Sequence, residues 1–265
     1  MLIKVSRCFI FKLQAVIVAI LFFAITSYSN DTTIVKNTNL LSLYSGFEYN
    51  TYQNPLASSR IYNGWALPII IDFKTVKNKY TDNLNLGWSS YSLNPIKNNG
   101  TSLTKIMANR IYLSYFNYRN IYKLPRAIFL LGGGIGSQAL INGFSYQFFH
   151  TVSYKTVDIT SSVDFAALSK ISINNDIFFL QFKYALVGCV MNNKYALGSL
   201  FTYDFFKLPQ YNSFDFRAQY LHAITKRIYL NINYTYYYVS YPRIFKIDYL
   251  KSGSNFILLG LTLKL

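Results

Sequence analysis

Apolar side chains alternate with other residues through most of this sequence, and that alternation limits how the chain can fold more than any other feature. Residues 228–238 show it most clearly, with Ile228 and Ile232 on one face and Asn231 and Asn233 on the other. Successive side chains of a β-strand point to opposite sides, so such a segment has one apolar and one more polar face. The pattern recurs in residues 65–76 and 213–222. The sequence therefore predicts an all-β fold.

The connections between these segments are alternately long and short. Long connections are expected at about residues 50–64, 92–108, 138–156, 191–212 and 241–254, and short ones at 77–83, 119–126, 169–175 and 223–227. Long loops on one side, with short turns and both termini on the other, are typical of bacterial outer-membrane barrels. We therefore expect an antiparallel transmembrane β-barrel over residues 40–265, with ten strands and with eight or twelve as the alternatives. Residues 197–206 can also form an extra hairpin arm or extend strands above the membrane.

The composition agrees with a single membrane domain. Hydrophobic residues make up 52% of the chain, aromatic residues 18% and charged residues only 14%. Beyond the N-terminus there is no run of about 18 apolar residues that could span a membrane as a helix. The low charge argues against a disordered or coiled-coil chain. A length of 265 residues leaves room for a leader and one barrel, and for no second domain.

The N-terminus has the features of a secretory signal peptide. Basic residues precede an apolar stretch over residues 13–25, and small residues follow it. This order predicts a cleaved signal over residues 1–29 and a short N-terminal leader over residues 30–39. The alternative is a retained N-terminal anchor. Cleavage would remove Cys8 and leave Cys189 alone, so no internal disulfide and no cysteine-based metal cluster are expected.

The alternation continues to the last residue. Residues 255–265 place one apolar face on every second position, made of Ile257, Leu259, Leu261, Leu263 and Leu265. In this the chain resembles small bacterial outer-membrane β-barrel proteins of the opacity-porin and outer-membrane-protein-A-like superfamily. The resemblance is architectural, covers about residues 40–265, and implies outer-membrane localisation and recognition of the last strand by the barrel-assembly machinery. The chain departs from those families at its end, which is usually Phe there and is Leu265 here.

Assigning the apolar faces to lipid turns a set of charged side chains toward the lumen. They are Glu48, Asp72, Lys74, Arg110, Asp158, Asp164, Lys183, Asp215, Arg217 and Lys264. Unpaired charges in a narrow interior are costly, whereas paired charges satisfy each other. We therefore interpret these acids and bases as a structural charge network that fills the barrel. The alternative is a narrow ion pathway, although ten strands enclose far less water than the 16 to 18 strands of open porins.

The remaining charge points to contacts outside the barrel. The formal net charge is +16, and the bases on the predicted long-loop side are Arg60, Lys97, Lys105, Lys155, Lys194, Lys207, Arg243, Lys246 and Lys251. Outer-membrane lipid and lipopolysaccharide phosphates are the anions that such loops meet first, so no nucleic acid partner is expected. Aromatic residues in 144–149 and 201–206 favour contact with a host or envelope protein. The alternative is that the bases only anchor the barrel at lipid headgroups.

No catalytic, cofactor or metal site is assigned from the sequence. His150 and His222 lie in no motif for a nucleophile or a metal. The glycine-rich residues 132–136 lack the Lys-Ser/Thr of a phosphate-binding loop, and they predict a strand in which a bulky neighbour or a bend needs space. The predicted function is a surface-exposed structural or interaction barrel with an adhesin-like role. The alternative is a narrow small-solute channel, and an outer-membrane lipid hydrolase ranks third.

Overall fold

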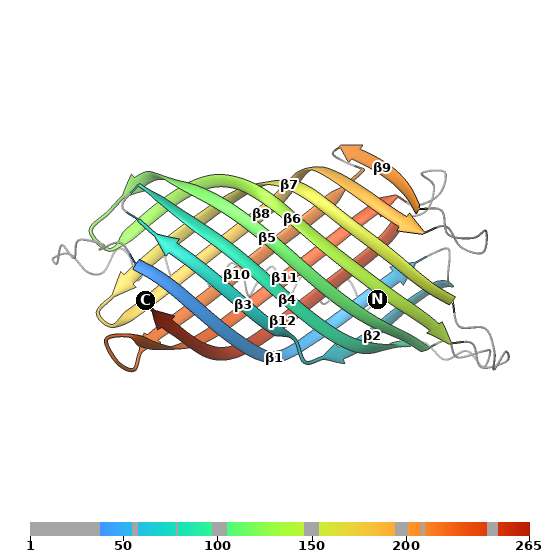
Figure 1. Cartoon of the computed structure of the whole chain (residues 1–265), viewed down its shortest axis with the longest axis horizontal. Coiled ribbons are helices and arrows are strands. Elements are labelled where there is room, and N and C mark those ends of the chain that lie inside the picture. The colour runs from blue at the N-terminus through green and yellow to red at the C-terminus, as the bar shows by residue number, and fades with distance from the viewer. Residues whose placement is uncertain are drawn as a thin grey trace.

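The computed structural model describes residues 38–54, 58–77, 79–96, 105–145, 154–193, 201–207, 210–242 and 249–265. Within these residues the chain forms one antiparallel sheet (Figure 1). Its strands are β1 (Thr38–Asn54), β2 (Ser58–Ala66), β3 (Ile69–Val76), β4 (Tyr80–Pro95), β5 (Lys105–Lys123), β6 (Ala127–Ser145), β7 (Tyr154–Ile173), β8 (Asp176–Asn193), β9 (Phe201–Lys207), β10 (Asn212–Ala223), β11 (Ile228–Pro242) and β12 (Tyr249–Lys264). No helix of this described part is long and apolar enough to cross a membrane.

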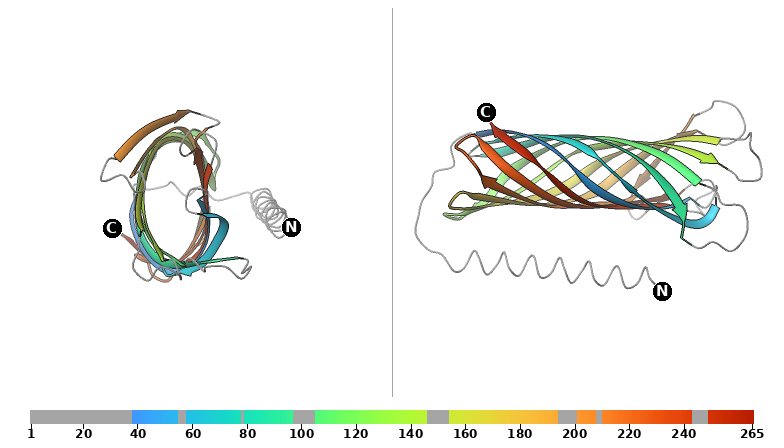
Figure 2. Two further views of the ribbon diagram at one scale, coloured as in Figure 1. Left: turned by 90° about the vertical axis from the view of Figure 1, so that its right-hand side faces the viewer. Right: turned by 90° about the horizontal axis from the view of Figure 1, so that it is seen from below.

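The sheet closes into a barrel because its last strand pairs with its first, β12 with β1. Two positions around the ring are each shared by two strands. β2 and β3 both lie between β1 and β4, while β9 and β10 pair with successive stretches of β8. The twelve strands therefore occupy ten positions, and the predicted ten-stranded barrel is confirmed. Figure 2 shows the ring end-on as an oval, with β9 standing outside it.

The strands run further into the predicted connections than the sequence pattern indicates. The connection predicted at 92–108 overlaps β4 and β5, which reach Pro95 and begin at Lys105, and β6 continues to Ser145. The turn predicted at 169–175 is also wrong in extent, because β7 continues to Ile173. Backbone N–H and C=O groups need partners, so ladder pairing with a neighbouring strand goes on after the apolar alternation has faded.

The hairpin alternative for residues 197–206 matches part of what is seen. Residues 201–207 form β9, which pairs with the part of β8 from Val187 to Asn193, next to the long connection. Phe206 of this strand is buried. It therefore does not belong to the exposed aromatic contact surface that was expected over residues 201–206.

The outer face of the barrel is apolar, as the alternation predicts. Large hydrophobic side chains on it are well exposed, for example Trp65 (65%), Ile135 (60%) and Ile257 (61%). In β11, Ile232 faces outward at 40% exposure, while Asn231 and Asn233 are buried inside. A soluble protein does not expose so much contiguous apolar surface, whereas a lipid-facing barrel must.

The interior has a layered composition that the sequence reading did not anticipate. An apolar cluster near the short turns, here the turn-end layer, consists of Leu40, Val76, Phe116, Tyr118, Ile128, Leu130, Ala166, Leu168, Phe179, Leu221 and Tyr229. A second cluster near the long connections, here the loop-end layer, consists of Tyr52, Tyr62, Ala66, Tyr91, Leu93, Ile106, Ala108, Leu140, Ala185, Val190, Phe206, Tyr211, Val239, Tyr241 and Leu250. Charged side chains occupy the space between the two layers, together with a smaller apolar cluster of Tyr44, Ile70, Phe256 and Leu258.

Candidate functional site

The charged layer between the two apolar layers begins with an ion pair across the lumen. Arg110 on β5 donates from Nη2 to the Glu48 carboxylate on β1, and both residues are almost fully buried. A second guanidinium nitrogen, Nη1, donates to Ser254 Oγ at 2.7 Å. The guanidinium also lies 5.0 Å from the centre of the Phe256 ring. Charge, hydrogen bonds and cation–π contact together compensate for its removal from water.

A second group of charges joins β3 to β10. Asp72 and Lys74 are two residues apart on β3, so both face inward, and Lys74 Nζ lies 2.6 Å from Asp72 Oδ2. Lys74 also donates across the lumen to Gln219 of β10. Arg217 Nη1, likewise on β10, lies 3.9 Å from Asp72 Oδ1. Asn85 Nδ2 donates to the same Asp72 oxygen at 3.2 Å, so a buried carboxylate is shared by several donors.

A third pair lies on neighbouring strands. Lys183 on β8 and Asp215 on β10 are directly opposite each other in the ladder, and Lys183 Nζ is 3.1 Å from Asp215 Oδ2. The Lys183 ammonium also sits 4.2 Å from the centre of the Phe116 ring. The acids Glu48, Asp72, Asp164 and Asp215 balance the bases Lys74, Arg110, Lys183 and Arg217 in this layer, so its formal charge is zero.

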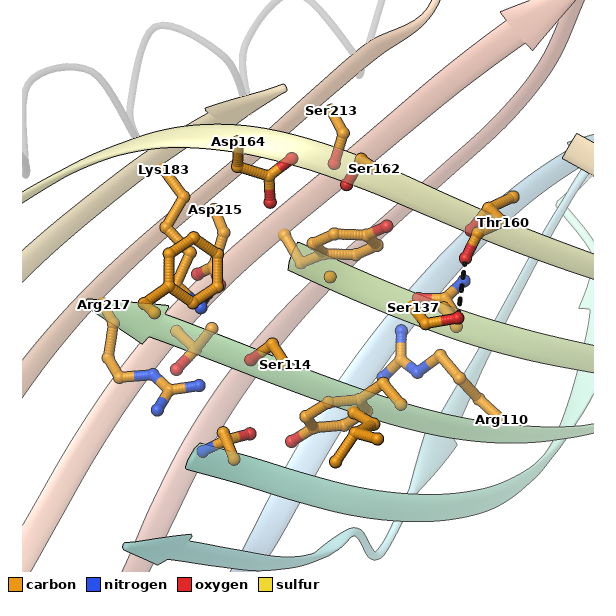
Figure 3. A pocket seen from close by; sticks show the side chains of 18 of the residues that line it. Arg110, Ser114, Ser137, Thr160, Ser162, Asp164, Lys183, Ser213, Asp215 and Arg217 are labelled. Atoms are coloured by element: carbon orange, nitrogen blue, oxygen red, sulfur yellow. Dashed lines mark hydrogen bonds and ion pairs between the residues drawn. The ribbon is translucent and has the colours of Figure 1, made fainter. Parts of the chain in front are cut away.

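A cavity of about 80 Å³ lies within the charged layer. Figure 3 shows Lys183, Asp215 and Arg217 together on one side of it, with Arg110 apart from them on the other. Several buried polar atoms have no hydrogen-bond partner among the described residues, including Arg217 Nε, Asp164 Oδ1 and Asp215 Oδ1. A cavity of this size holds about five to eight waters at roughly 10–15 Å³ of accessible volume each. Such waters could satisfy these donors and acceptors.

The ten lumen residues predicted from sequence all belong to the inward-facing positions, but they do not form one network. Seven of them take part in the ion pairs above. Asp164 is buried beside the cavity and bonds with Ser162. Asp158 lies further toward the long connections, where β7 pairs with Asn192. Lys264 lies at the opposite end, next to Leu40 in the ladder.

Sequence reasoning missed the inward-facing base Lys170. It is only 8% exposed and lies between Ile128 of β6 and Phe179 of β8 in the ladder. The residue was assigned to the turn predicted at 169–175. The signal that could have found it is the even-numbered inward series of β7, which passes through Ala166 and Leu168 before reaching Lys170.

The histidines provide no catalytic arrangement in the described residues. His222 lies at the short-turn end, half exposed, with Nδ1 2.7 Å from Asp176 Oδ1. His150 lies outside the described residues. The described part of the chain also contains no group of three or more His, Cys, Asp or Glu side chains that could hold a metal ion.

The glycine-rich segment is a strand, as predicted. It forms part of β6, where Gly134 is paired with Phe116 and Gly132 with Tyr118 of β5. A Cβ atom at Gly134 would lie 2.1 Å from the Tyr115 carbonyl oxygen and 2.6 Å from the Phe116 ring. The expectation that a bulky neighbour needs this space is therefore confirmed.

Comparison with solved structures identifies the fold. The outer membrane protease OmpT from Escherichia coli superposes with a TM-score of 0.54 at 12% identity, covering 89% of this chain and all of that one. The chain has the fold of a bacterial outer-membrane β-barrel. At this identity the likeness of the barrel concerns architecture alone. The translocator domain of the autotransporter NalP from Neisseria meningitidis, covering 97% of each chain at 8% identity, has a TM-score of 0.48. No protein-family model and no curated protein matches the sequence.

The arrangement inside the barrel is that of a filled core. Two apolar layers enclose a neutral set of ion pairs, and two of these pairs reach across the lumen from one wall to another. Outer-membrane barrels more commonly have a polar interior, open in porins and plugged in others. Here the side chains of the wall itself occupy the cross-section.

Proposed function

We propose that this protein is a surface-exposed interaction barrel of the bacterial outer membrane, with a structural or adhesin-like role carried by its long connections. The observation that carries the proposal is the filled interior. Two apolar layers lie in series along the lumen, with a charged layer between them. A solute or ion would have to pass two apolar layers, whose hydrocarbon and aromatic side chains raise the free energy of a charge that moves between them. The filled interior thus favours an interaction role over the narrow-channel alternative.

The proposal includes export and membrane insertion. Residues 1–29 are a cleaved signal peptide and residues 30–39 a short leader, both ahead of most of the barrel. The outward face of β12 at Ile257, Leu259 and Leu261 is exposed and apolar. Such a face suits recognition of the last strand by the barrel-assembly machinery and subsequent contact with lipid.

The proposed ligands are anions and proteins at the cell surface. The bases of the long connections are supplied by segments such as residues 243–248 and 194–200, which contain Arg243, Lys246 and Lys194. Lysine and arginine attract lipopolysaccharide phosphates, which are the densest anions at that surface. A host or envelope protein is the second class of partner, because aromatic residues occur beside these bases.

Two measurements on the refolded full-length chain test this proposal. In planar bilayers the barrel is expected to insert without ion conductance, and on immobilised lipopolysaccharide it is expected to bind with an affinity that falls as salt is raised. A variant with Arg243→Gln and Lys246→Gln should bind more weakly. Lys79→Gln removes an exposed charge from the short-turn end and serves as control. Stable single-channel currents, or binding that is equal in both variants and the parent, would contradict the proposed role.

A further inference from the structure

The cavity in the charged layer lies where one level of the barrel wall is built of small residues. Ser114 on β5, Gly136 on β6 and Ser162 on β7 are directly opposite one another in the ladder, and all three line the cavity. The next inward row toward the long connections contains the larger Tyr112 and Gln138. The wall therefore leaves about 80 Å³ of the lumen unfilled at this level.

Two buried side chains bring unsatisfied charge to this cavity. Arg217 is 4% exposed, and its Nε and Nη1 have no hydrogen-bond partner among the described residues. Its ion pair with Asp72, at 3.9 Å, is too long for a hydrogen bond. Asp164 is 8% exposed and bonds with Ser162, but its Oδ1 has no partner in the same part of the chain. No described base forms an ion pair with it.

The charge balance of the layer decides which kind of molecule suits the cavity. The acids and bases of this layer cancel, so a lone anion or cation would add a net charge to a space bounded by two apolar layers. Such a charge is costly. A molecule with one positive and one negative group keeps the layer neutral, and it can bind Asp164 and Arg217 at the same time.

The volume limits the size of this molecule. A cavity of about 80 Å³ has room for about five to eight waters, and so for a molecule of about five to eight non-hydrogen atoms. Asp215 and Arg217 are two residues apart on β10, which separates them by about 7 Å along the strand. An α-amino acid has one carbon between its ammonium and its carboxylate. With a hydrogen bond of about 2.8 Å at each end it spans a gap of this order.

We propose that the cavity binds a small zwitterion of the α-amino-acid class, such as glycine, alanine or serine. Its carboxylate accepts hydrogen bonds from Nε and Nη1 of Arg217, and its ammonium donates to the free Oδ1 atoms of Asp164 and Asp215. Figure 3 shows these three side chains along one side of the cavity. The bound molecule completes the filling of the lumen, and the site is independent of the long connections and of their proposed ligands.

Refolding of the full chain in millimolar alanine tests the site. Alanine is present during refolding because two apolar layers enclose the cavity and we expect slow exchange. The readouts are the radiolabelled alanine that the folded barrel retains after gel filtration and the unfolding temperature on heat-modifiability gels. Acetate and methylammonium, which carry one charge each, are compared at equal ionic strength. The parent should retain alanine and unfold at a higher temperature with it, and neither single ion should have this effect.

Two variants remove the site in different ways. Asp164→Asn should bind alanine at least tenfold more weakly, while unfolding without alanine at the temperature of the parent, because Asp164 has no ion pair to lose. Ser114→Leu fills the hollow and should exclude alanine. Asp176→Asn, which changes a carboxylate at the short-turn end, and Ser90→Leu, which makes the same change on the exposed outer face, are the matched controls. Both controls should bind as the parent does.

Three results would overturn the assignment. The first is a parent that retains no alanine and shows no shift, which would mean that the cavity holds water only. The second is equal binding by the parent and by Asp164→Asn or Ser114→Leu. The third is stabilisation by acetate or methylammonium as strong as that by alanine, which would indicate a site for a single ion. If Asp164→Asn does not fold, the comparison of Ser114→Leu with Ser90→Leu decides.

Discussion

Single charged side chains connect distant strands of the barrel across its interior. Arg217 extends from β10 toward Asp72 on β3, which lies on the far side of β11, β12 and β1 in the ring. Arg110 makes a comparable link from β5 to Glu48 on β1. Each of these side chains is buried, so each depends on a partner that another strand supplies. Replacing one member of such a pair by a neutral residue leaves the other member as an unpaired charge in a poorly hydrated space.

At this scale we expect Arg217→Gln to lower the free energy of unfolding by about 3–5 kcal/mol, because Asp72 and Asp215 lose a nearby cation. Lys251→Gln removes an exposed charge near the long connections and should cost about 0–1 kcal/mol. Heat-modifiable migration on gels gives the readout. If both variants lose the folded band at one temperature, the buried charges are not a structural network.

Individual strands carry their own packing constraints. On the inner face of β6, glycines make room for the aromatic rings of β5, as at Gly134 beside Phe116. Further along the same strand, a Cβ at Gly143 would meet its nearest atom, the Met107 carbonyl oxygen, at 3.8 Å. One strand thus contains both a crowded and a tolerant glycine, because Gly134 faces the packed interior whereas Gly143, at an odd spacing from it, faces outward.

We expect Gly134→Ala to destabilise the barrel by about 1–3 kcal/mol, since the added methyl overlaps backbone and ring atoms that cannot both move. Gly143→Ala makes the same chemical change in the same strand and should be close to neutral. Unfolding in urea, followed by tyrosine fluorescence, compares the two. Similar losses in both variants would indicate an effect of glycine removal itself and not of the Phe116 contact.

The outer face of β12 tests how the strand sits in a membrane. Ile257 lies near the middle of the strand and Leu263 near its end at the short turns, and both are exposed. In lipid vesicles Ile257→Arg should cost about 2–4 kcal/mol and Leu263→Arg about 0–1, because the penalty for a cation falls from the bilayer centre toward the interface. Equal penalties would show that the barrel wall is not centred on Ile257.

Two apolar layers lie one after the other along the axis of the barrel. The turn-end and loop-end layers lie in series, and we expect each to hinder a continuous path of water along the lumen. The charged layer between them contains a small cavity of about 80 Å³. This order separates the barrel from porins, whose polar lumen is continuous.

Because the two apolar layers lie in series, we expect conductance to appear only when both layers are opened. Phe179→Ala opens the turn-end layer and Tyr241→Ala the loop-end layer, and each alone should remain silent in planar bilayers because the other layer still blocks the lumen. The double variant should show small currents. A folded band on heat-modifiability gels must accompany each recording. Currents from a single variant would mean that only one layer closes the barrel.

The sequence by itself determined which side chains face lipid and which face inward, whereas the strand pairings decided between ten positions around the ring and the alternatives of eight or twelve. The reason is that strand alternation has a period of two and is local, so Ile257 and Asp72 could be assigned to a face without knowing their neighbours. Only the tertiary structure decided which inward residues meet. Alternation says nothing about height along the barrel or position around it. These two coordinates bring Arg217 to Asp72 and gather Phe116 and Phe179 into an apolar layer.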